Sequence, residues 1–384
     1  MPDRYSLDPV DLTESLVAID SRNPDLVPGG PGESACAIFL ADVLSHWGFA
    51  VSLQEVVPGR HNVLARIGPT EKSPLVLNGH LDVVGVDGMV HEPFNPVVRN
   101  GRMYGRGSSD MKSGIASMCV AAARAATRGA LHSEIIIAAV CDEEFASVGT
   151  QALLANGLRA TAAIVTEPTR LAVCPAHRGF AWLRVDFTGH AAHGSRYDLG
   201  IDAIRNAGLF LTALDAMENE VLPTREHALM GRPSVHASMI NGGTGWSTYP
   251  ERCTLHVERR TVSGETGESV LAELVAMCEQ LSADRETFKA EVTLELFQPA
   301  SDLAVDAPLT QALIGALTRE SLAAPVEGLS CWTDAALFNQ AGIPALCFGP
   351  GDIALAHSAE EWVEVEEIHR ATAVLERVCS AWGR

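Results

Sequence analysis

The chain has 384 residues, 47% of them hydrophobic, and a formal net charge of -20. This length and composition favour two domains with buried cores. The negative charge argues against nucleic acid as a partner, because nucleic-acid binding needs a basic surface.

The first part of the chain alternates helix-like and strand-like patterns. The spacing of apolar residues predicts helices at 10–19, 34–47, 113–128 and 151–156. Short apolar or alternating runs predict strands at 51–56, 63–67, 74–77, 134–140 and 162–165. The alternation indicates an α/β layered domain with helices on both faces of a sheet.

The pattern changes near Gly179. Strands are predicted at 182–187, 235–240, 253–259 and 291–297, with helices at 201–218 and 269–281. This β-α-β-β-α-β order indicates a small α+β domain inserted into the first one. A helix at 309–318 and a core strand at 345–348 then resume the first domain. We therefore expect a discontinuous catalytic domain, 1–179 and 298–384, and an inserted domain, 180–297.

Cysteine usage and the N-terminus indicate the compartment. The nine cysteines occur without a CxxC pair, and several lie in apolar runs. This is typical of small buried hydrophobic residues in a reducing compartment. Residues 1–9 have no apolar signal-peptide core, and no stretch reaches the roughly 18 apolar residues of a membrane span. We expect a cytoplasmic protein with no membrane partner.

A histidine and an aspartate follow the predicted strand at 74–77. Residues two apart in a strand point to the same side, so His80 and Asp82 lie together. His80 can offer a ring nitrogen to a metal, and Asp82 can hold the imidazole in the required tautomer. A simple His-Asp pair at a loop is the alternative.

Asp110 follows a glycine-containing turn and directly precedes the predicted helix at 113–128. A carboxylate at this place can bind a metal, and it can equally cap the helix.

Three consecutive carboxylates, Asp142 to Glu144, follow the apolar strand at 134–140. They repel one another and lose solvation at the end of a buried strand, unless a cation is bound. Adjacent residues point in different directions, so one glutamate can bind a metal while its neighbour acts as general base. A solvated acidic turn is the alternative.

Glu167 and His357 each follow a further apolar run. Taken singly, each is most often a solvated loop residue. Sites in α/β sheets, however, gather at the carboxyl ends of strands. Two histidines and three carboxylates there can hold two divalent metals that share one carboxylate, a centre that hydrolyses amides and esters.

In combination these segments resemble the acetylornithine deacetylase and succinyl-diaminopimelate desuccinylase family of dinuclear zinc amidohydrolases, which includes aminoacylases, dipeptidases and glutamate carboxypeptidases. The resemblance covers nearly the whole chain. It implies a zinc-peptidase-like α/β catalytic domain with an inserted α+β lid that forms a homodimer.

The resemblance also implies a role for each ligand. His80 and Glu167 would hold one metal, Glu144 and His357 the other, and Asp110 would bridge them. Glu143 would be the general base, and Asp82 would support His80. The expected metals are two zinc ions, although the same ligands suit cobalt and manganese.

The lid residues follow from the same resemblance. His193 matches a lid histidine that reaches the partner's active site and stabilises the oxyanion, with His190 as the weaker candidate. Arg259 is preferred over Arg260 for the substrate carboxylate, and Arg178 can assist. Asn241 and Thr333 match substrate-loop segments. For all of these, ordinary surface or turn chemistry is the alternative.

Two departures bear on the substrate. Ser247–Pro250 lacks an asparagine common in the family, and His91–Phe94 lacks a common tryptophan. Both weaken a desuccinylase assignment, whereas the segment from Gly349 to His357 favours the acetylornithine deacetylase branch. We therefore predict hydrolysis of an N-acyl amino acid, most of all an N-acetyl amino acid such as N-acetylornithine. A dipeptidase or carboxypeptidase, and a non-catalytic amino-acid-binding dimer, are the alternatives.

Overall fold

The structure, a computed structural model, describes residues 4–70 and 73–384. The chain divides into two compact units. The first unit contains Met1–Pro175, Leu303–Glu327 and Thr333–Arg384, and the second contains Ala176–Asp302 and Gly328–Trp332. The sequence predicts boundaries at 179/180 and 297/298 and does not predict the return of 328–332 to the second unit. The catalytic and lid roles of the two units stay predictions.

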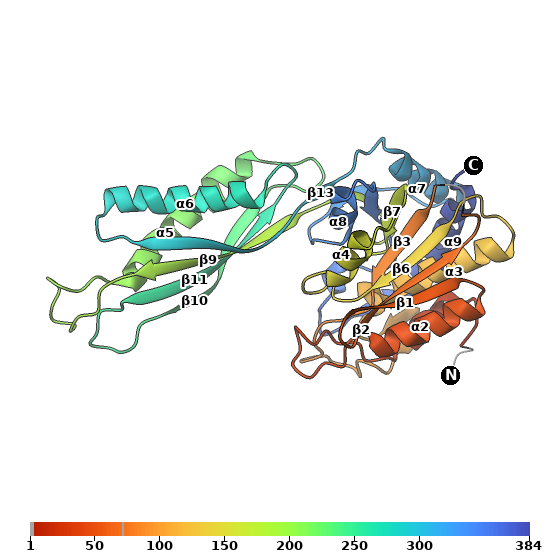
Figure 1. The fold of residues 1–384 in the computed structure, drawn as a ribbon, viewed down its shortest axis with the longest axis horizontal. Coiled ribbons are helices and arrows are strands. Elements are labelled where there is room, and N and C mark those ends of the chain that lie inside the picture. Colours follow the sequence, from red (N-terminus) through yellow and green to blue (C-terminus); the bar gives the residue numbers. More distant parts are fainter. Residues whose placement is uncertain (1–3, 71–72) are drawn as a thin grey trace. The chain divides into compact units, whose positions relative to one another are not determined.

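A mixed sheet forms the centre of the first unit (Figure 1). Its strand order is β1-β2-β6-β3-β7-β15-β8-β13, where β13 is the two-residue strand Ser301–Asp302. The pairs β6–β3, β3–β7 and β7–β15 are parallel, and the outer pairs are antiparallel. The strands are β1 (Ala50–Val57), β2 (Arg60–Ile67), β3 (Leu75–His80), β6 (Ile135–Val140), β7 (Ala162–Val165), β8 (Val173–His177) and β15 (Ala345–Cys347).

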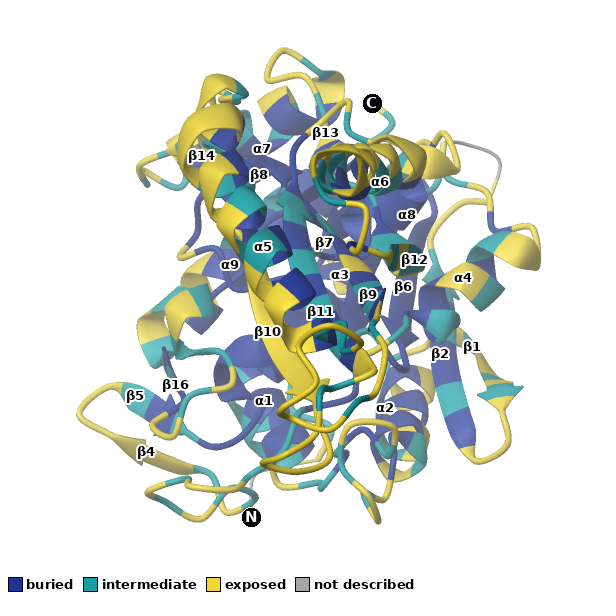
Figure 2. Cartoon of the chain, turned by 90° about the vertical axis from the view of Figure 1, so that its left-hand side faces the viewer, coloured by how far each residue is buried: buried dark blue, intermediate teal, exposed yellow. Residues whose placement is uncertain are grey.

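Helices pack against both faces of the sheet, and the residues between them are buried. The helices are α1 (Pro9–Val17), α2 (Ser34–His46), α3 (Ser113–Thr127), α4 (Val148–Ala155), α7 (Pro308–Arg319), α8 (Ala335–Gln340) and α9 (Val365–Ala381). Leu75 and Leu77 of β3 share one apolar cluster with α1, α2, α3, α7 and α9. Val76, which points to the other face, is equally buried. Figure 2 shows the central strands as buried, so the predicted α/β layered architecture is confirmed.

Sequence analysis does not predict several elements of this unit, including β8 and α8. A small sheet joins β4 (Val97–Arg99), β5 (Arg102–Tyr104) and β16 (Trp362–Glu364). Short helical turns cover Ser108–Lys112 and Ile353–Leu355. Helix α9 buries Ile368, Ala371, Leu375 and Val378 on one face, a spacing that the sequence alone would have supported.

The second unit is an antiparallel sheet with order β10-β11-β9-β12 and two main helices. Its elements are β9 (Gly179–Thr188), α5 (Ala203–Ala216), β10 (Ser234–Gly242), β11 (Arg252–Thr261), α6 (Gly267–Asp284) and β12 (Ala290–Gln298), with short turns at Met217–Val221 and Leu222–Thr224. Two further short strands are β13 (Ser301–Asp302) and β14 (Val326–Leu329), the second of which spans the boundary between the units. Leu183, Val185 and Phe187 pack into one cluster with α5 and α6. The predicted β-α-β-β-α-β order is observed.

Within the part of the chain that the structure describes, no helix combines the length and apolar composition needed to cross a bilayer.

Gly114 lies where α3 begins against the end of β7. A Cβ atom at this position would lie 2.0 Å from the Thr166 carbonyl oxygen. Because the nearest atom is a backbone carbonyl oxygen that cannot rotate away, Gly114→Ala should destabilise the first unit by about 1–3 kcal/mol or more, through overpacking. Thermal unfolding would measure this as a lower midpoint.

Gly315→Ala is the matched control. Gly315 lies in α7, and its added Cβ would meet only the flexible Arg319 side chain, at 3.6 Å or more. An alanine inside a helix should raise stability by roughly 0.5–1 kcal/mol. Equal midpoints for the two variants would contradict the packing argument.

Candidate metal centre

The carboxyl ends of three parallel strands bring the expected residues together. His80 ends β3, and Glu167 follows β7 by two residues. In the sheet, His80 pairs with Val140 of β6, and Asn78 pairs with Val165 of β7. Because these strands are parallel, the segments that follow them emerge at one edge of the sheet.

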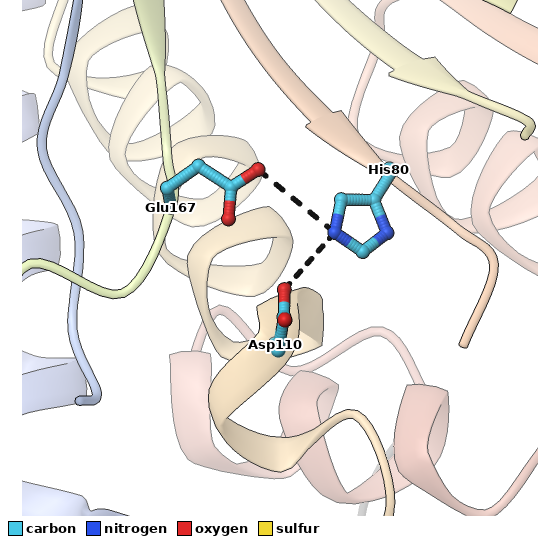
Figure 3. A group of neighbouring side chains, drawn as sticks. All are labelled: His80, Asp110 and Glu167. Atoms are coloured by element: carbon cyan, nitrogen blue, oxygen red, sulfur yellow. Dashed lines mark hydrogen bonds and ion pairs between the residues drawn. The ribbon is translucent and has the colours of Figure 1, made fainter. Parts of the chain in front are cut away.

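The first group of ligands is His80, Asp110 and Glu167, all buried. The imidazole of His80 points between the two carboxylates (Figure 3). His80 Nε2 lies 3.1 Å from Asp110 Oδ1 and 3.9 Å from Glu167 Oε1. His80 Nδ1 lies 3.0 Å from the Asp82 carbonyl oxygen, a contact that orients the ring.

The second group is Asp110, Glu144 and His357. His357 Nε2 lies 2.9 Å from Glu144 Oε2 and 3.6 Å from Asp110 Oδ2. In each group, each of the three residues offers one potential ligand atom. These three atoms lie within 4.8 Å of one another. Asp110 belongs to both groups, so the five predicted ligands form two triads that share one carboxylate. This donor set fits two divalent cations.

Asp82 supports the site from behind. Its carboxylate is fully buried and lies 3.6 Å from His80 Nδ1. It accepts hydrogen bonds from the backbone N–H groups of Glu143 and Glu144, at 3.2 and 3.1 Å, and from Asn23 Nδ2 at 2.8 Å. Asp82 therefore holds both the histidine and the segment that carries the two glutamates.

Burial and mutual repulsion perturb the carboxylates. Burial raises the pKa of Glu143 well above its usual range, and the neighbouring Glu167, Asp334 and Glu144 charges raise it further. Burial and the Asp110 charge likewise raise the pKa of Glu144 and of Glu167. A bound cation would remove this repulsion, which is a second reason why the site suits metals.

The same negative charges also raise the pKa values of the two histidines, because they stabilise the charged, protonated imidazole. The hydrogen bond to Glu144 raises the pKa of His357 to about 9. Burial alone would lower the pKa of His80, but Asp110, Glu143 and Glu167 hold it well above its usual value.

These shifts predict how metal binding and stability depend on pH. In the metal-free protein, the raised pKa values of Glu143, Glu144, Glu167 and His357 favour protonated forms. The stability that these protonated groups contribute is fully present at pH values below the pKa of each group in the unfolded state. It is lost as the pH rises through the pKa of the same group in the folded protein. Bound metal replaces these protons. The unfolding midpoints of metal-loaded and chelator-treated protein should therefore separate further from pH 6 to pH 8.5.

The expected separation is several degrees, since 1 kcal/mol shifts the midpoint of a domain of this size by about 2–4 °C. Differential scanning calorimetry across this pH range would measure it. A separation that stays constant or shrinks towards high pH would contradict the assigned proton–metal competition.

A buried ion-pair network positions Asp142, and sequence analysis misses it. Asp142 has a left-handed backbone, with φ of 67°. Its Oδ1 accepts from Arg60 Nη1 at 2.8 Å and from Asn23 Nδ2 at 3.1 Å. Arg60 also pairs with the fully buried Glu33. The first of the three consecutive carboxylates thus points to Arg60, while Glu143 and Glu144 lie beside the histidines.

Asp334 is a further buried acid, which sequence analysis places in a substrate-loop segment without a role of its own. Burial raises the pKa of Asp334 to about 6, and its carboxylate accepts from Thr150 Oγ1 at 2.6 Å. Its neighbour Thr333, predicted to contact substrate, is also buried, with Oγ1 3.1 Å from Cys347 Sγ.

The other predicted substrate residues lie in the second unit. The exposed His193 accepts the Ser195 backbone N–H through Nδ1. Asn241 lies in the exposed part of β10. Arg178 is half-buried, and its Nε donates to the Met230 carbonyl at 2.8 Å. No carboxylate within the described ranges forms an ion pair with it.

Arg259 and Arg260 face opposite sides of β11. Arg259 is 0% exposed and pairs with Glu265 inside the second unit. Arg260 is half-buried, pairs with Glu258, and lies 5.3 Å from the Phe180 ring centroid. Arg259 would have to leave Glu265 to bind a substrate.

A layered α/β unit that gathers histidines and carboxylates at its strand ends defines the class of this protein as a metal-dependent hydrolase. The chain belongs to Peptidase family M20/M25/M40, which matches residues 76–381. This confirms the predicted family.

Similar proteins include two curated enzymes. An acetylornithine deacetylase from Myxococcus xanthus is 33% identical over 311 residues, which are 80% of this chain and 79% of that protein. An N-formyl-4-amino-5-aminomethyl-2-methylpyrimidine deformylase from Bacillus subtilis (strain 168) is 27% identical and covers 97% of this chain and 94% of its own.

Solved structures share the fold. An M20 family metallo-carboxypeptidase from Sulfolobus solfataricus superposes with a TM-score of 0.81 at 17% sequence identity. The match covers 98% of this chain and 99% of that one.

Proposed function

We propose that this hydrolase cleaves the amide bond of an N-acyl amino acid, with N-acetyl amino acids such as N-acetylornithine as the first substrate class. The observation that carries this proposal is the pair of triads that share Asp110, with Glu143 beside them. The two similar enzymes are named as a deacetylase and a deformylase, that is, for the removal of an acyl group.

The metal-binding roles are part of the proposal. His80 and Glu167 would hold one cation, Glu144 and His357 the other, and Asp110 both. The expected cations are zinc, with cobalt or manganese suited to the same ligands. Bound there, they would supply Lewis acidity and lower the pKa of a water molecule.

Glu143 is the proposed general base. Its carboxylate is 10% exposed and lies 3.9 Å from His80 Nε2. Its raised pKa suits a group that takes a proton from the attacking water near neutral pH and then gives it to the leaving amine nitrogen. Asp82 would keep His80 oriented during this transfer.

The second unit would contribute substrate contacts. Arg178, which lacks an ion-pair partner within the described ranges, is the favoured carboxylate ligand. Arg260 is a better second candidate than Arg259, because Arg259 is buried against Glu265. Asn241 of the second unit and Thr333 of the first stay proposed substrate residues.

A homodimer is proposed through the second unit, with His193 stabilising the oxyanion in the partner's site. Strand β10 is at the sheet edge, and its Met239 and Ile240 are 61% and 54% exposed. Exposed apolar side chains on an edge strand support pairing with a second copy. The exposed position of His193 is compatible with this role.

A peptidase is the second candidate, because the carboxypeptidase from Sulfolobus solfataricus has the same fold. A substrate panel tests both functions. Protein stripped of metal and reloaded with zinc or cobalt would be assayed on N-acetyl amino acids, N-succinyl amino acids and dipeptides. Metal-restored turnover of N-acetyl substrates is expected. Turnover of dipeptides alone would establish the peptidase, and no turnover with two metals bound would contradict both.

A further inference from the structure

Glu361 is a fully buried carboxylate outside the proposed ligand set. Its Oε1 accepts the backbone N–H groups of Ser109 and Asp110, at 2.9 and 3.1 Å. Its Oε2 accepts the Gly107 N–H at 3.0 Å and Arg106 Nη1 at 2.6 Å. Four donors therefore converge on one side chain, and three of them belong to the turn that carries Asp110.

This turn depends on such support. Gly107 has a left-handed backbone, with φ of 82°, and Asp110 leaves helical geometry with φ of -120° and ψ of 95°. The N–H groups of Gly107, Ser109 and Asp110 bond to Glu361 and not to backbone carbonyls, and a buried N–H without a partner is costly. Glu361 satisfies these groups and thereby fixes the direction in which the Asp110 carboxylate points.

Arg106 extends the support to two other ligand segments. Its Nε donates to the Gly85 carbonyl at 3.1 Å, in the segment that follows His80 and Asp82. Its Nη2 donates to the Ser358 carbonyl at 3.4 Å, next to His357. Glu361 itself lies four residues after His357. The Arg106–Glu361 pair thus joins the segments that carry His80, Asp110 and His357.

The two triads depend on this pair to different degrees. His80 and Glu167 have side chains only 1% and 4% exposed, so packing fixes them. The His357 side chain is 53% exposed, and its backbone is left-handed with φ of 60°. Little packing holds His357 in place, so its position relative to Asp110 depends on the segment anchored by Glu361.

We propose that Glu361, with Arg106, is a positioning residue that holds the second metal site, Asp110–Glu144–His357, in place. Its loss weakens this site much more than the first, which shares Asp110 but whose His80 and Glu167 are fixed by packing. This inference rests on the dinuclear centre proposed above. An ordinary structural ion pair would behave differently, because its loss would weaken both sites together or lower stability without changing metal binding.

Glu361→Gln tests the proposal. Glutamine keeps the shape of the side chain and one acceptor oxygen. Its NH₂ group, however, must face either the Gly107 N–H and Arg106 or, with the amide flipped, the Ser109 and Asp110 N–H groups. Metal-free protein would be titrated with Co²⁺ by absorption spectroscopy, and bound metal would be counted by elemental analysis. We expect the second cation to bind about 10–100-fold more weakly, with the first within about threefold of wild type.

Glu360→Gln is the matched control, because it makes the same chemical change at the exposed neighbouring residue. It should bind both cations like the wild type. Arg106→Lys is the second variant, used also if Glu361→Gln does not fold. It keeps the charge but loses the planar fork, and it should selectively weaken the second cation as well.

The outcomes separate this inference from the proposed function. Wild-type protein that binds fewer than two cations would contradict the dinuclear centre itself. Wild-type protein with two cations, combined with unchanged binding or an equal loss at both sites in Glu361→Gln and Arg106→Lys, would overturn only the positioning role.

Discussion

Replacing Glu143 with glutamine should lower kcat by about 10²–10⁴-fold, the usual contribution of a positioned general base. Glutamine has nearly the same shape but cannot take a proton from water. The expected metal content is that of the wild type, because Glu143 belongs to neither triad. Turnover of the best substrate from the panel and the metal content of the same sample would be measured together.

The pH profile distinguishes this role from a structural one. In the wild type, the acidic limb of kcat should report protonation of Glu143, and this limb should be absent from the residual activity of Glu143→Gln. The exposed Glu360→Gln variant should retain both rate and profile. A Glu143→Gln enzyme with more than about a tenth of wild-type kcat would contradict the assignment, because general-base catalysis supplies more than this.

Replacing Asp110 with asparagine should disrupt both metal sites at once. Asp110 is the one residue common to the two triads, and its buried carboxylate lies 3.1 Å from His80 and 3.6 Å from His357. An amide carries no charge and offers a single oxygen. Bound metal should fall from about two equivalents to below one, and activity should be lost with it.

Two variants sharpen this test. His357→Ala should remove only the second cation, because His357 belongs to one triad. The exposed Asp306→Asn variant should bind metal normally. The readouts are elemental analysis after gel filtration and the rise in unfolding midpoint on adding zinc. An Asp110→Asn protein that keeps two tightly bound metals would show that Asp110 does not bridge them.

Local patterns were enough to predict the layered α/β architecture of the first unit and the strands of the second. The continuous apolar run at 134–140 became the fully buried β6, and the alternation at 182–187 became β9, with Trp182 37% exposed and Leu183 buried. These predictions succeed because burial on one or both sides of a sheet leaves a short-range signature in the chain. The sequence of α9 has an equally clear amphipathic pattern, which would also have predicted this helix.

The residues that hold the ligand segments in place leave no periodic pattern of this kind in the sequence. Glu361 contacts the Asp110 backbone across 251 positions of sequence, and Arg60 contacts Asp142 across 82. In sequence, each is a single charged residue, indistinguishable from an exposed one. Which of Arg259 and Arg260 is buried also depends on which face of β11 the helices cover, and the alternation of the strand does not specify this.

The sequence by itself therefore determined which residues have metal-binding chemistry and that most of them follow core strands. Only the tertiary structure decided how they combine: that Asp110 lies between His80 and His357, that Asp142 points to Arg60, and that Glu361 holds the Asp110 turn. The physical reason is that hydrophobic periodicity acts over a few residues. Contacts between loops depend instead on strand order and on the pairing of buried charges, which are set by the whole fold.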